Sequence, residues 1–462
     1  MSNKKQGINF NPFIVMACMV IACAAASYVI APGAYDRETI DGVTRVLADS
    51  YHPVDRTPVT LFQIFKSLPE GLTATANMMF VVMLIGGVVQ IYSDTGVMAA
   101  AINSVLNVKK VSSEAIISLI MIAFFVIGGI LGWSEQIIPF VPIVISLTLA
   151  LGYDSLVGMA ISGFACLISF AVGPFNVYTV GTSHTIAELP MFSGWQLRIC
   201  ALLVICALSL FWVLRYARKI KKDPSKSLMA DVDTSDLRIP TDISDVLNTP
   251  KTLSLVVLAI SFAVVIYGLL NLGWSYTEMG AVFMMGGIVV ALLNRVAPTA
   301  CVNMILKGMR GAMEGALIIG AARAVQVTMS YGGIIDPIVH GLSTMMQSSS
   351  QYLTSCVMFI MNFFINMLIP SGSGQATAVM PIMVPLADML GITRQTAVLA
   401  FQFGDGISNT FWFSNGTLLI YCALAKLSLK KWYKFILPLH GIFVLVEFVF
   451  LYIAVATGYG PF

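Results

Sequence analysis

The amino-acid sequence predicts an all-α polytopic membrane protein that consists of two similar halves. Hydrophobic residues make up 58% of the 462 residues and charged residues only 11%, which is typical of proteins that cross a membrane many times. Apolar runs long enough for a spanning helix recur along the chain, and one soluble core would not bury so much apolar surface. A polar stretch at residues 219–250 separates two apolar parts of similar length.

The first apolar run, at residues 13–30, is expected to remain as the first spanning helix. It is long and lacks a convincing small-residue cleavage site, so it differs from a cleavable signal peptide. Further apolar runs follow at residues 78–92, 199–214, 253–270 and 437–455. These runs predict a multi-pass protein in contact with the lipid bilayer.

Charged side chains predict how the chain is oriented in the membrane. Lys and Arg gather at Lys4 and Lys5, at Lys109 and Lys110, and at residues 215–226, 295–310 and 426–434. By the positive-inside rule these segments lie in the cytoplasm. Residues 34–55 carry mixed charges and residues 457–462 carry none, so both are expected outside. The N-terminus is therefore predicted to be cytoplasmic and the C-terminus external.

Cysteine, histidine and net charge predict neither a metal cofactor nor a nucleic-acid partner. The eight cysteines sit without metal-ligand spacing, and the four histidines form no His-Glu-x-x-His motif. A net charge of +3 requires no nucleic acid. A metalloprotease therefore has little support.

The two halves align with each other at three points in the same order. At a shift of 239 residues, seven of nineteen positions from residue 134 onward are identical, and shifts of 236 and 233 align segments on either side. Among the aligned pairs are Gln90 and Gln326, Ser134 and Ser373, Gln136 and Gln375, Gly173 and Gly406, and Asn176 and Asn409. This order predicts a duplication, as in many secondary transporters.

The charge map predicts that the repeats are inverted. The segment around Lys109 is expected in the cytoplasm, whereas its counterpart at residues 336–350 has no Lys or Arg and is expected outside. The predicted parts are a first membrane half (1–218), a cytoplasmic linker (219–250) and a second membrane half (251–462). Just before the second polar tip, Asp336 is expected to cap a short amphipathic helix that lies flat in the interface.

Each half has a polar tip between two apolar arms. The tip GWSEQ lies within residues 113–152, and the tip SGSGQ lies within residues 351–391. Unpaired backbone groups in hydrocarbon cost several kcal/mol each, so such tips are tolerated only against protein or a water-filled cavity. We therefore predict two re-entrant hairpins, the first entering from the cytoplasm and the second from outside. Free N–H groups and helix N-termini at the tips suit an anion, while free carbonyls suit a cation.

Each half also has a segment that interrupts a helix. Residues 173–176 read GPFN and residues 404–409 read GDGISN, and proline and glycine at these places break or weaken a helix. An inverted repeat would bring both tips and both breaks to the middle of the membrane. That arrangement predicts a site for a solute.

The residues resemble a known family at this point. The motifs are GWSEQ followed by PIVISLTLALGYDSLVGMAI, the tip IPSGSG, ARAVQV at residues 322–327 and RYARKIKKDPSKS at residues 215–227. Together, in this order and over almost the whole chain, they resemble the YfcC-type, ArcD-like basic amino acid antiporters. These are grouped with the C4-dicarboxylate anaerobic carriers in the wider ion transporter superfamily. One departure is TFWFSNG at residues 410–416, where the family pattern has a Pro-Thr-Ser-Gly stretch.

The resemblance implies a secondary transporter of the bacterial inner membrane. It also implies scaffold and transport domains, a homodimer and an elevator-type motion. Periodicity and composition do not predict the motion by themselves.

Charged residues within the membrane bear on the solute, because intramembrane charge is expensive. Glu135 lies at the first tip, Asp405 in the second break and Arg323 in the ARAVQV helix. Two acids beside one arginine fit an amino acid, with its carboxylate and ammonium, better than a dicarboxylate. Either acid could instead titrate and couple transport to protons. The alternatives are that Arg323 pairs with Glu314 or snorkels, and that Asp405 caps a helix.

The candidate solute site combines the tips, the breaks and these charges. We predict that it consists of Ser134, Glu135, Gln136, Asn176, Arg323, Ser371, Gly372, Ser373, Gly374, Gln375, Asp405, Ser408 and Asn409. A coupling Na⁺ is expected near Ser134, Asn176, Ser373 and Asn409; the other coupling ion considered is H⁺. The predicted function is amino acid transport, with basic amino acids favoured, and a C4-dicarboxylate or other small carboxylate carrier is the alternative.

Two other function classes fit the sequence less well. An intramembrane hydrolase would need Ser371 or Ser373 with His340, but His340 belongs to the interfacial stretch. The serine tip also recurs in the first half without a histidine beside it. A passive channel is the third class. We therefore predict a transporter and not an enzyme.

Overall fold

The computed structural model describes residues 12–40, 43–47, 50–107, 111–239, 246–344 and 350–460. Lys4, Lys5, Lys109 and Lys110, whose charges entered the orientation prediction, lie outside these ranges. Within them, eight helices are long and apolar enough to cross a membrane, or nine if one bent pair is a single span. The chain is thus a mostly helical multi-pass protein, as its composition predicts.

The first half of the chain contains α1 to α10 and four short strands. Between the first two helices, β1 (Gly33–Ala34) pairs antiparallel with β4 (His52–Pro53), and β2 (Arg37–Ile40) pairs antiparallel with β3 (Val43–Val46). The helices are α1 (Pro12–Ala26), α2 (Leu61–Ala74), α3 (Ala76–Asp94), α4 (Val97–Leu106), α5 (Ser113–Leu131), α6 (Val141–Ala150), α7 (Ser155–Met159), α8 (Ala165–Val172), α9 (Thr182–Ile186) and α10 (Trp195–Lys222).

The second half contains α11 to α19. These helices are α11 (Thr249–Asn271), α12 (Tyr276–Leu293), α13 (Pro298–Tyr331), α14 (Ile335–Thr344), α15 (Gln351–Leu368), α16 (Gly372–Met389), α17 (Arg394–Ser408), α18 (Gly416–Leu424) and α19 (Leu429–Ala456). Shorter turns connect several helices: 3₁₀ turns at Glu135–Phe140, Pro224–Lys226 and Ser235–Leu237, and π turns at Ala160–Phe164 and Val177–Gly181.

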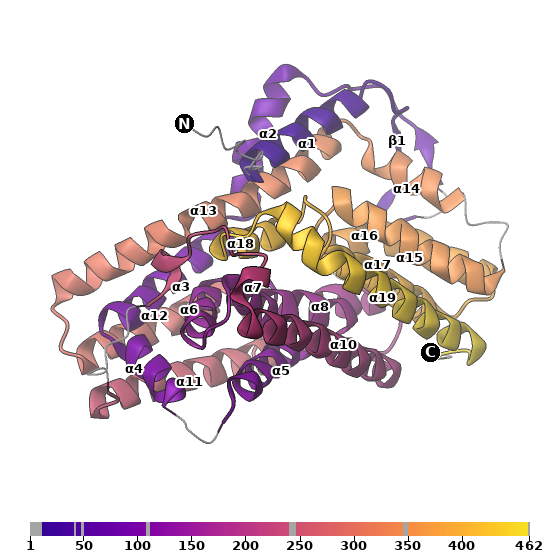
Figure 1. Cartoon of the computed structure of the whole chain (residues 1–462). Coiled ribbons are helices and arrows are strands. Elements are labelled where there is room, and N and C mark those ends of the chain that lie inside the picture. Colours follow the sequence, from indigo (N-terminus) through magenta and orange to yellow (C-terminus); the bar gives the residue numbers. More distant parts are fainter. Residues whose placement is uncertain are drawn as a thin grey trace, which may run out of the picture.

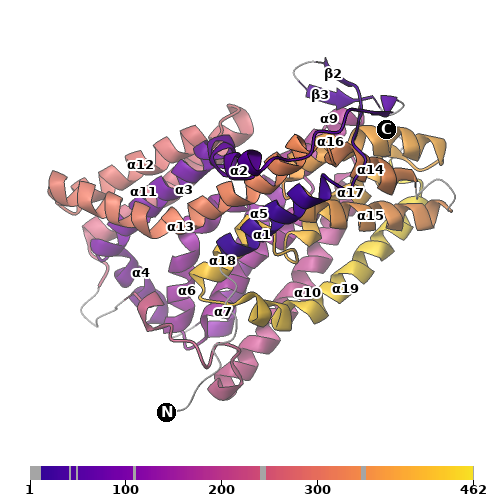
Figure 2. The same ribbon diagram turned by 90° about the horizontal axis from the view of Figure 1, so that it is seen from above.

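The helices gather in two groups, seen in Figure 1 and from above in Figure 2. In the first group, α11 and α12 pack side by side, α12 packs against α3, and α13 runs along α2 and α3. In the second group, α15, α16, α17 and α19 lie together, and α17 also packs against α8 of the first half. The core therefore joins elements from both halves of the chain.

Local sequence explains where several of these helices begin and end. The Ser112 hydroxyl accepts the Ala115 N–H at the start of α5, and Thr393 caps α17 in the same way. α5 ends at Leu131 and is followed by Gly132, whose φ of +65° favours glycine. Asn415 caps α18 by accepting the Leu418 N–H at 2.9 Å. These polar side chains thus accept hydrogen bonds from backbone N–H groups that the helix itself leaves without a partner.

Two pairs of helices form closed helical hairpins. Hairpin 2 consists of α15, a tip at residues 369–371 and α16, and the Gln351 amide donates to the carbonyls of Leu390 and Gly391 at 3.1 and 3.0 Å. Hairpin 1 consists of α5, a tip at residues 132–134, the 3₁₀ turn and α6. Lys221 Nζ donates to Ser113 Oγ at 2.9 Å and to the Leu151 carbonyl at 3.3 Å. The two ends of each hairpin are therefore held together, opposite its tip.

The first helix break lies where proline and glycine predict it, at residues 173–176 between α8 and the π turn. The predicted second break is wrong in position, because α17 continues through residues 404–408 and the interruption lies at residues 409–415. The reason is packing. A Cβ at Gly404 would overlap the Phe359 backbone of α15, and a Cβ at Gly406 would overlap Ala171 of α8. These glycines allow close helix packing instead of interrupting the helix.

The short helix α14 bends by 81° away from α13. It begins at Ile335, so Asp336 is not its capping residue. The Asp336 carboxylate instead pairs with Arg37 at 2.7 Å and accepts the Tyr35 N–H at 3.1 Å. This contact joins α14 to the stranded segment before α2, which is consistent with their predicted position on the same side of the membrane.

Candidate functional site

A cavity of about 300 Å³ lies where the two hairpin tips meet. Its volume is at the lower end of the ~300–1,000 Å³ typical of small-molecule sites. Both hairpins, α8, the π turn after the first break, the end of the second break and the helices α3, α12, α13 and α18 contribute to its wall. Six of the predicted site residues line it: Ser134, Glu135, Arg323, Ser371, Gly372 and Ser373.

Glu135 is the acidic group of this cavity. The Ser134 hydroxyl donates to Glu135 Oε2 at 2.5 Å, and the Thr417 hydroxyl donates to Glu135 Oε1 at 3.2 Å. The carboxylate is partly buried, so water screens its negative charge less than it would at the protein surface. It can accept hydrogen bonds from a cationic group of a solute.

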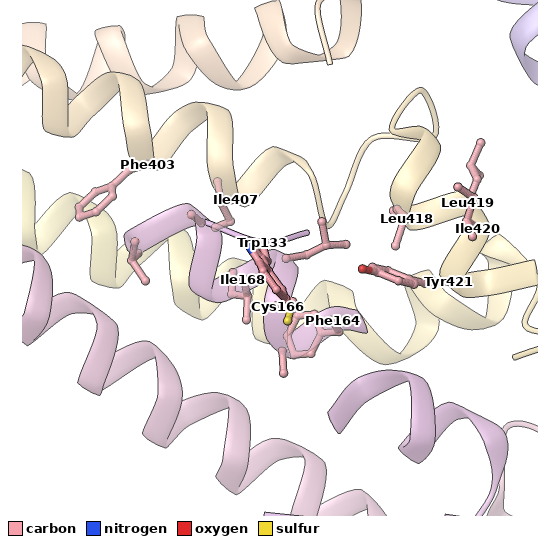
Figure 3. Packing of buried hydrophobic residues seen from close by; sticks show 14 of the residues in the cluster. Trp133, Phe164, Cys166, Ile168, Phe403, Ile407, Leu418, Leu419, Ile420 and Tyr421 are labelled. Atoms are coloured by element: carbon pink, nitrogen blue, oxygen red, sulfur yellow. The ribbon is translucent and has the colours of Figure 1, made fainter. Parts of the chain in front are cut away.

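The backbone at the first tip is fixed by side chains from distant helices. The Tyr421 hydroxyl donates to the Ser134 carbonyl, and in Figure 3 this hydroxyl is turned toward the segment around Trp133. Trp133 is buried near Phe164 and Cys166 (Figure 3). Gln136 accepts the Ser134 N–H at 3.0 Å. These hydrogen bonds hold the tip in place, and Gln136 supports it instead of lining the cavity.

Two helix N-termini face the cavity from the second half of the chain. Ser371 caps α16 through the Gly374 N–H, and residues 371–373 line the cavity. Asn415, Gly416 and Thr417, at the start of α18, line it as well. The first N–H groups of a helix have no intrahelical partner, and the helix dipole makes this end positive. Both ends therefore favour a carboxylate in the cavity.

Arg323 is the basic group of this cavity. It comes from α13, is half-buried and donates a hydrogen bond to Gln326, which also lines the cavity. The guanidinium can pair directly with a carboxylate in the cavity, because its planar fork of N–H groups matches the two carboxylate oxygens. The alternative pairing with Glu314 is not observed, since within the described part of the chain the Arg323 side chain forms no ion pair.

Besides Gln136, six predicted site residues do not line the cavity: Asn176, Gly374, Gln375, Asp405, Ser408 and Asn409. Most of them form hydrogen bonds at the ends or interruptions of helices. Asn176 accepts the N–H groups of Tyr178 and Thr179, and Asn409 accepts from the Asn415 amide at 2.7 Å. Ser408 donates to the Asp405 carbonyl at 2.6 Å. Gln375 donates to Asn362 at 2.9 Å, which ties the two arms of hairpin 2 together.

The sequence reasoning missed several cavity residues. Tyr178 and Tyr276 line the cavity, and their hydroxyls accept from the Gln136 amide at 3.3 and 3.5 Å. Asn415 and Thr417 lie at or just beyond the TFWFSNG segment, so the departure from the family pattern marked this place. Tyr276 gave no such signal, because α12 meets the first tip only in the folded protein.

Comparisons with known proteins identify the family. The model of the C4-dicarboxylate anaerobic carrier family matches residues 11–456. The chain belongs to this family. The resemblance inferred from the sequence motifs is thereby confirmed, and membership of a carrier family makes the chain a membrane transporter.

Two relatives match most of the chain. The "Putative basic amino acid antiporter YfcC" of Escherichia coli (strain K12) is 26% identical over 490 residues, covering 96% of this chain and 96% of that protein. An uncharacterized protein of Haemophilus influenzae is 26% identical over 416 residues, covering 88% of this chain and 81% of that protein.

Two solved structures match at low identity. The YdaH transporter of Alcanivorax borkumensis is 16% identical, with a TM-score of 0.47, and the match covers 97% of this chain and 100% of that one. MtrF of Neisseria gonorrhoeae, which represents a class of antimetabolite efflux pumps, is 15% identical, with a TM-score of 0.49 and coverage of 97% and 96%.

Proposed function

We propose that this protein is a secondary active transporter of amino acids, with basic amino acids favoured, and that the solute binds in the cavity between the hairpin tips. The observation that carries the proposal is the pairing of charges in that cavity. Glu135 is the acid and Arg323 the base among its lining residues. An α-amino acid offers an ammonium to the first and a carboxylate to the second.

The solute carboxylate has a further reason to face the second half of the chain. The N-termini of α16 and α18 both point into the cavity, and unpaired N–H groups there stabilise negative charge. The solute ammonium, or a basic side chain, would then lie toward Glu135. Basic amino acids are favoured because the relative YfcC is named as a basic amino acid antiporter.

A C4-dicarboxylate is the second candidate solute. The family description names this class, and Arg323 with two helix N-termini could hold two carboxylates. Against it stands Glu135, whose negative charge would repel one carboxylate at short range. The two candidates therefore differ in the sign of the interaction with Glu135.

We also propose that the two hairpins enter from opposite faces of the membrane, as an inverted repeat requires. The base of hairpin 1 is held by Lys221 at the end of α10. The linker after α10 contacts the segment just before α19, where Lys426 Nζ lies 2.5 Å from Asp236 Oδ1. Thr393 follows the base of hairpin 2 and caps α17. Its hydroxyl donates to the carbonyl of Tyr459, beyond the other end of α19, at 2.8 Å. A spanning α19 would separate the two bases.

The proposed location is the bacterial inner membrane, with a cytoplasmic N-terminus and an external C-terminus. The proposed mechanism is an elevator-type motion. Its moving body would be the hairpins with α8 and α17, and its scaffold would include α3, α11, α12 and α13. Packing supports this division, because α3, α12 and α13 pack mainly against one another, whereas α5 and α17 both pack against α8 and α17 packs against α15 and α16. A homodimer remains part of the proposal.

The test is uptake into proteoliposomes of radiolabelled arginine, ornithine, aspartate and succinate. Each solute is measured with and without unlabelled solute inside, and with imposed Na⁺ or proton gradients. Arginine or ornithine uptake that depends on internal counter-solute would support the amino acid antiporter. Succinate uptake without amino acid uptake would refute the preferred solute and establish the dicarboxylate alternative.

A further inference from the structure

Arg198 is a buried cation that lies outside the solute cavity. It comes from the first turn of α10, and its exposed fraction is 0%. In the part of the chain that the structure describes, no acid forms an ion pair with it. Its Nη1 instead donates to neutral oxygen atoms: the Ser193 and Gly194 carbonyls, the Gln395 amide and the Tyr459 hydroxyl. A buried charge without a counter-ion is costly, so these neutral partners only partly compensate for its burial.

One further partner connects Arg198 to the first helix break. Arg198 Nε donates to Gln402 Oε1 at 2.8 Å, and Gln402 Nε2 donates to the Gly173 carbonyl at 2.7 Å. Gln402 belongs to α17 and is fully buried. A guanidinium group only donates hydrogen bonds and a carbonyl only accepts them, so a single orientation of the amide between them satisfies both. Arg198 therefore determines which end of the Gln402 amide faces Gly173.

The first break is held by two side-chain amides. Gly173 directly follows α8, and the last carbonyls of a helix have no intrahelical partner. Gln402 donates to the Gly173 carbonyl, and Asn176 Nδ2 donates to the Phe170 carbonyl at 3.0 Å. The carbonyl end of a helix carries partial negative charge, so the positive charge of Arg198 behind Gln402 is favourable there.

The position of this break bears directly on the solute cavity. Phe170 precedes the break, Tyr178 follows it, and both line the cavity. The Tyr178 N–H is accepted by Asn176 at 3.0 Å, and the Tyr178 hydroxyl accepts from the Gln136 amide of hairpin 1 at 3.3 Å. A change in the backbone at Gly173 would therefore move two side chains of the cavity wall.

We propose that Arg198 is a positioning residue of the solute site. It orients the Gln402 amide, which holds the Gly173 carbonyl and so fixes the first break in the conformation that places Phe170 and Tyr178. This inference rests on the proposed function for one step only, the use of the cavity as the solute site. The effect on the break itself does not depend on which solute is carried.

The first test is hydrogen exchange of the full-length protein in detergent, without solute, followed by mass spectrometry at residues 173–181. Gln402→Glu still accepts the hydrogen bond from Arg198 but presents an oxygen to the Gly173 carbonyl, so only the second hydrogen bond is lost. We expect exchange in this segment to become about tenfold faster, because a buried carbonyl loses its donor. If Arg198 only joined α10 to α17, the variant would keep that contact and the segment would exchange as in the wild type.

The matched control is Gln395→Glu. Gln395 lies on the same helix and also accepts from Arg198, at 3.3 Å, but its Nε2 donates to Ser193 Oγ and not to the break. It introduces the same charge beside the same arginine and should leave exchange at residues 173–181 unchanged.

Two further substitutions test the link between Arg198 and Gln402. Arg198→Lys keeps a charged donor for the amide and should leave exchange at the break close to that of the wild type. Arg198→Gln removes the obligatory donor and should accelerate exchange there. If Gln402→Glu does not fold, Gln402→Asn serves in its place, because its shorter neutral side chain cannot reach both partners.

Transport gives the second readout. In proteoliposomes, Gln402→Glu should raise the KM for arginine more than it lowers the maximal rate, because it displaces the wall of the binding cavity. Gln395→Glu should keep both values.

Three exchange results would overturn the positioning role: unchanged exchange at residues 173–181 in the Gln402 variant, an equal rise in Gln395→Glu, or a rise that extends equally through α10 and α17. Faster exchange at the break with an unchanged KM would overturn its connection to the solute site. A wild type that moves no arginine would refute the preferred solute, and the exchange measurement would still test the break.

Discussion

Replacing Glu135 by glutamine tests the charge pairing on which the proposed solute depends. The substitution keeps the shape of the side chain and removes its negative charge, while the hydroxyls of Ser134 and Thr417 remain as neighbours. A hydrogen bond between charged groups contributes about 1.5–3 kcal/mol. Since 1.4 kcal/mol is a factor of ten, the KM for arginine should rise about 10- to 150-fold.

The assay is arginine counterflow in proteoliposomes, with KM and maximal rate determined for each variant. Succinate serves as an internal comparison, because removal of a nearby negative charge should leave its binding unchanged or improve it. Arg323→Gln should weaken arginine and aspartate alike, since both offer a carboxylate. Glu447→Gln is the control for loss of a buried carboxylate away from the cavity. An unchanged arginine KM in a folded Glu135→Gln protein would refute the assignment of Glu135 to the solute cation.

Two further predictions concern packing and orientation. Gly173→Ala should destabilise the protein by about 1–3 kcal/mol, because its Cβ would lie 2.5 Å from the Gly129 carbonyl oxygen, and a lowered thermal unfolding temperature would record this. Gly311→Ala, with open space around it, is the control and should not lower that temperature. In a cysteine-free background, Ser235→Cys should react with an impermeant maleimide only from the cytoplasmic side and Thr457→Cys only from outside. Labelling of both from one side would contradict the proposed crossing of α19.

The error at the second break shows a limit of local patterns. Glycine in an apolar run either loosens a helix or lets another backbone approach it, and the two cases look alike in one sequence. Gly404 and Gly406 serve close packing against α15 and α8. The actual interruption, at residues 409–415, has no proline or glycine and is instead bounded by the capping asparagine Asn415.

The sequence by itself determined the helical membrane class, the family, the two tips and the first break. These features follow from composition and from short segments whose glycine, proline and serine residues cannot continue an apolar helix. Only the tertiary structure decided which side chains meet. Glu135 and Thr417 are 282 residues apart in the chain yet share a hydrogen bond. The cavity between the hairpin tips and the position of Asp405 behind Gly372 likewise arise from long-range packing. A local sequence pattern does not show which distant helices will come into contact.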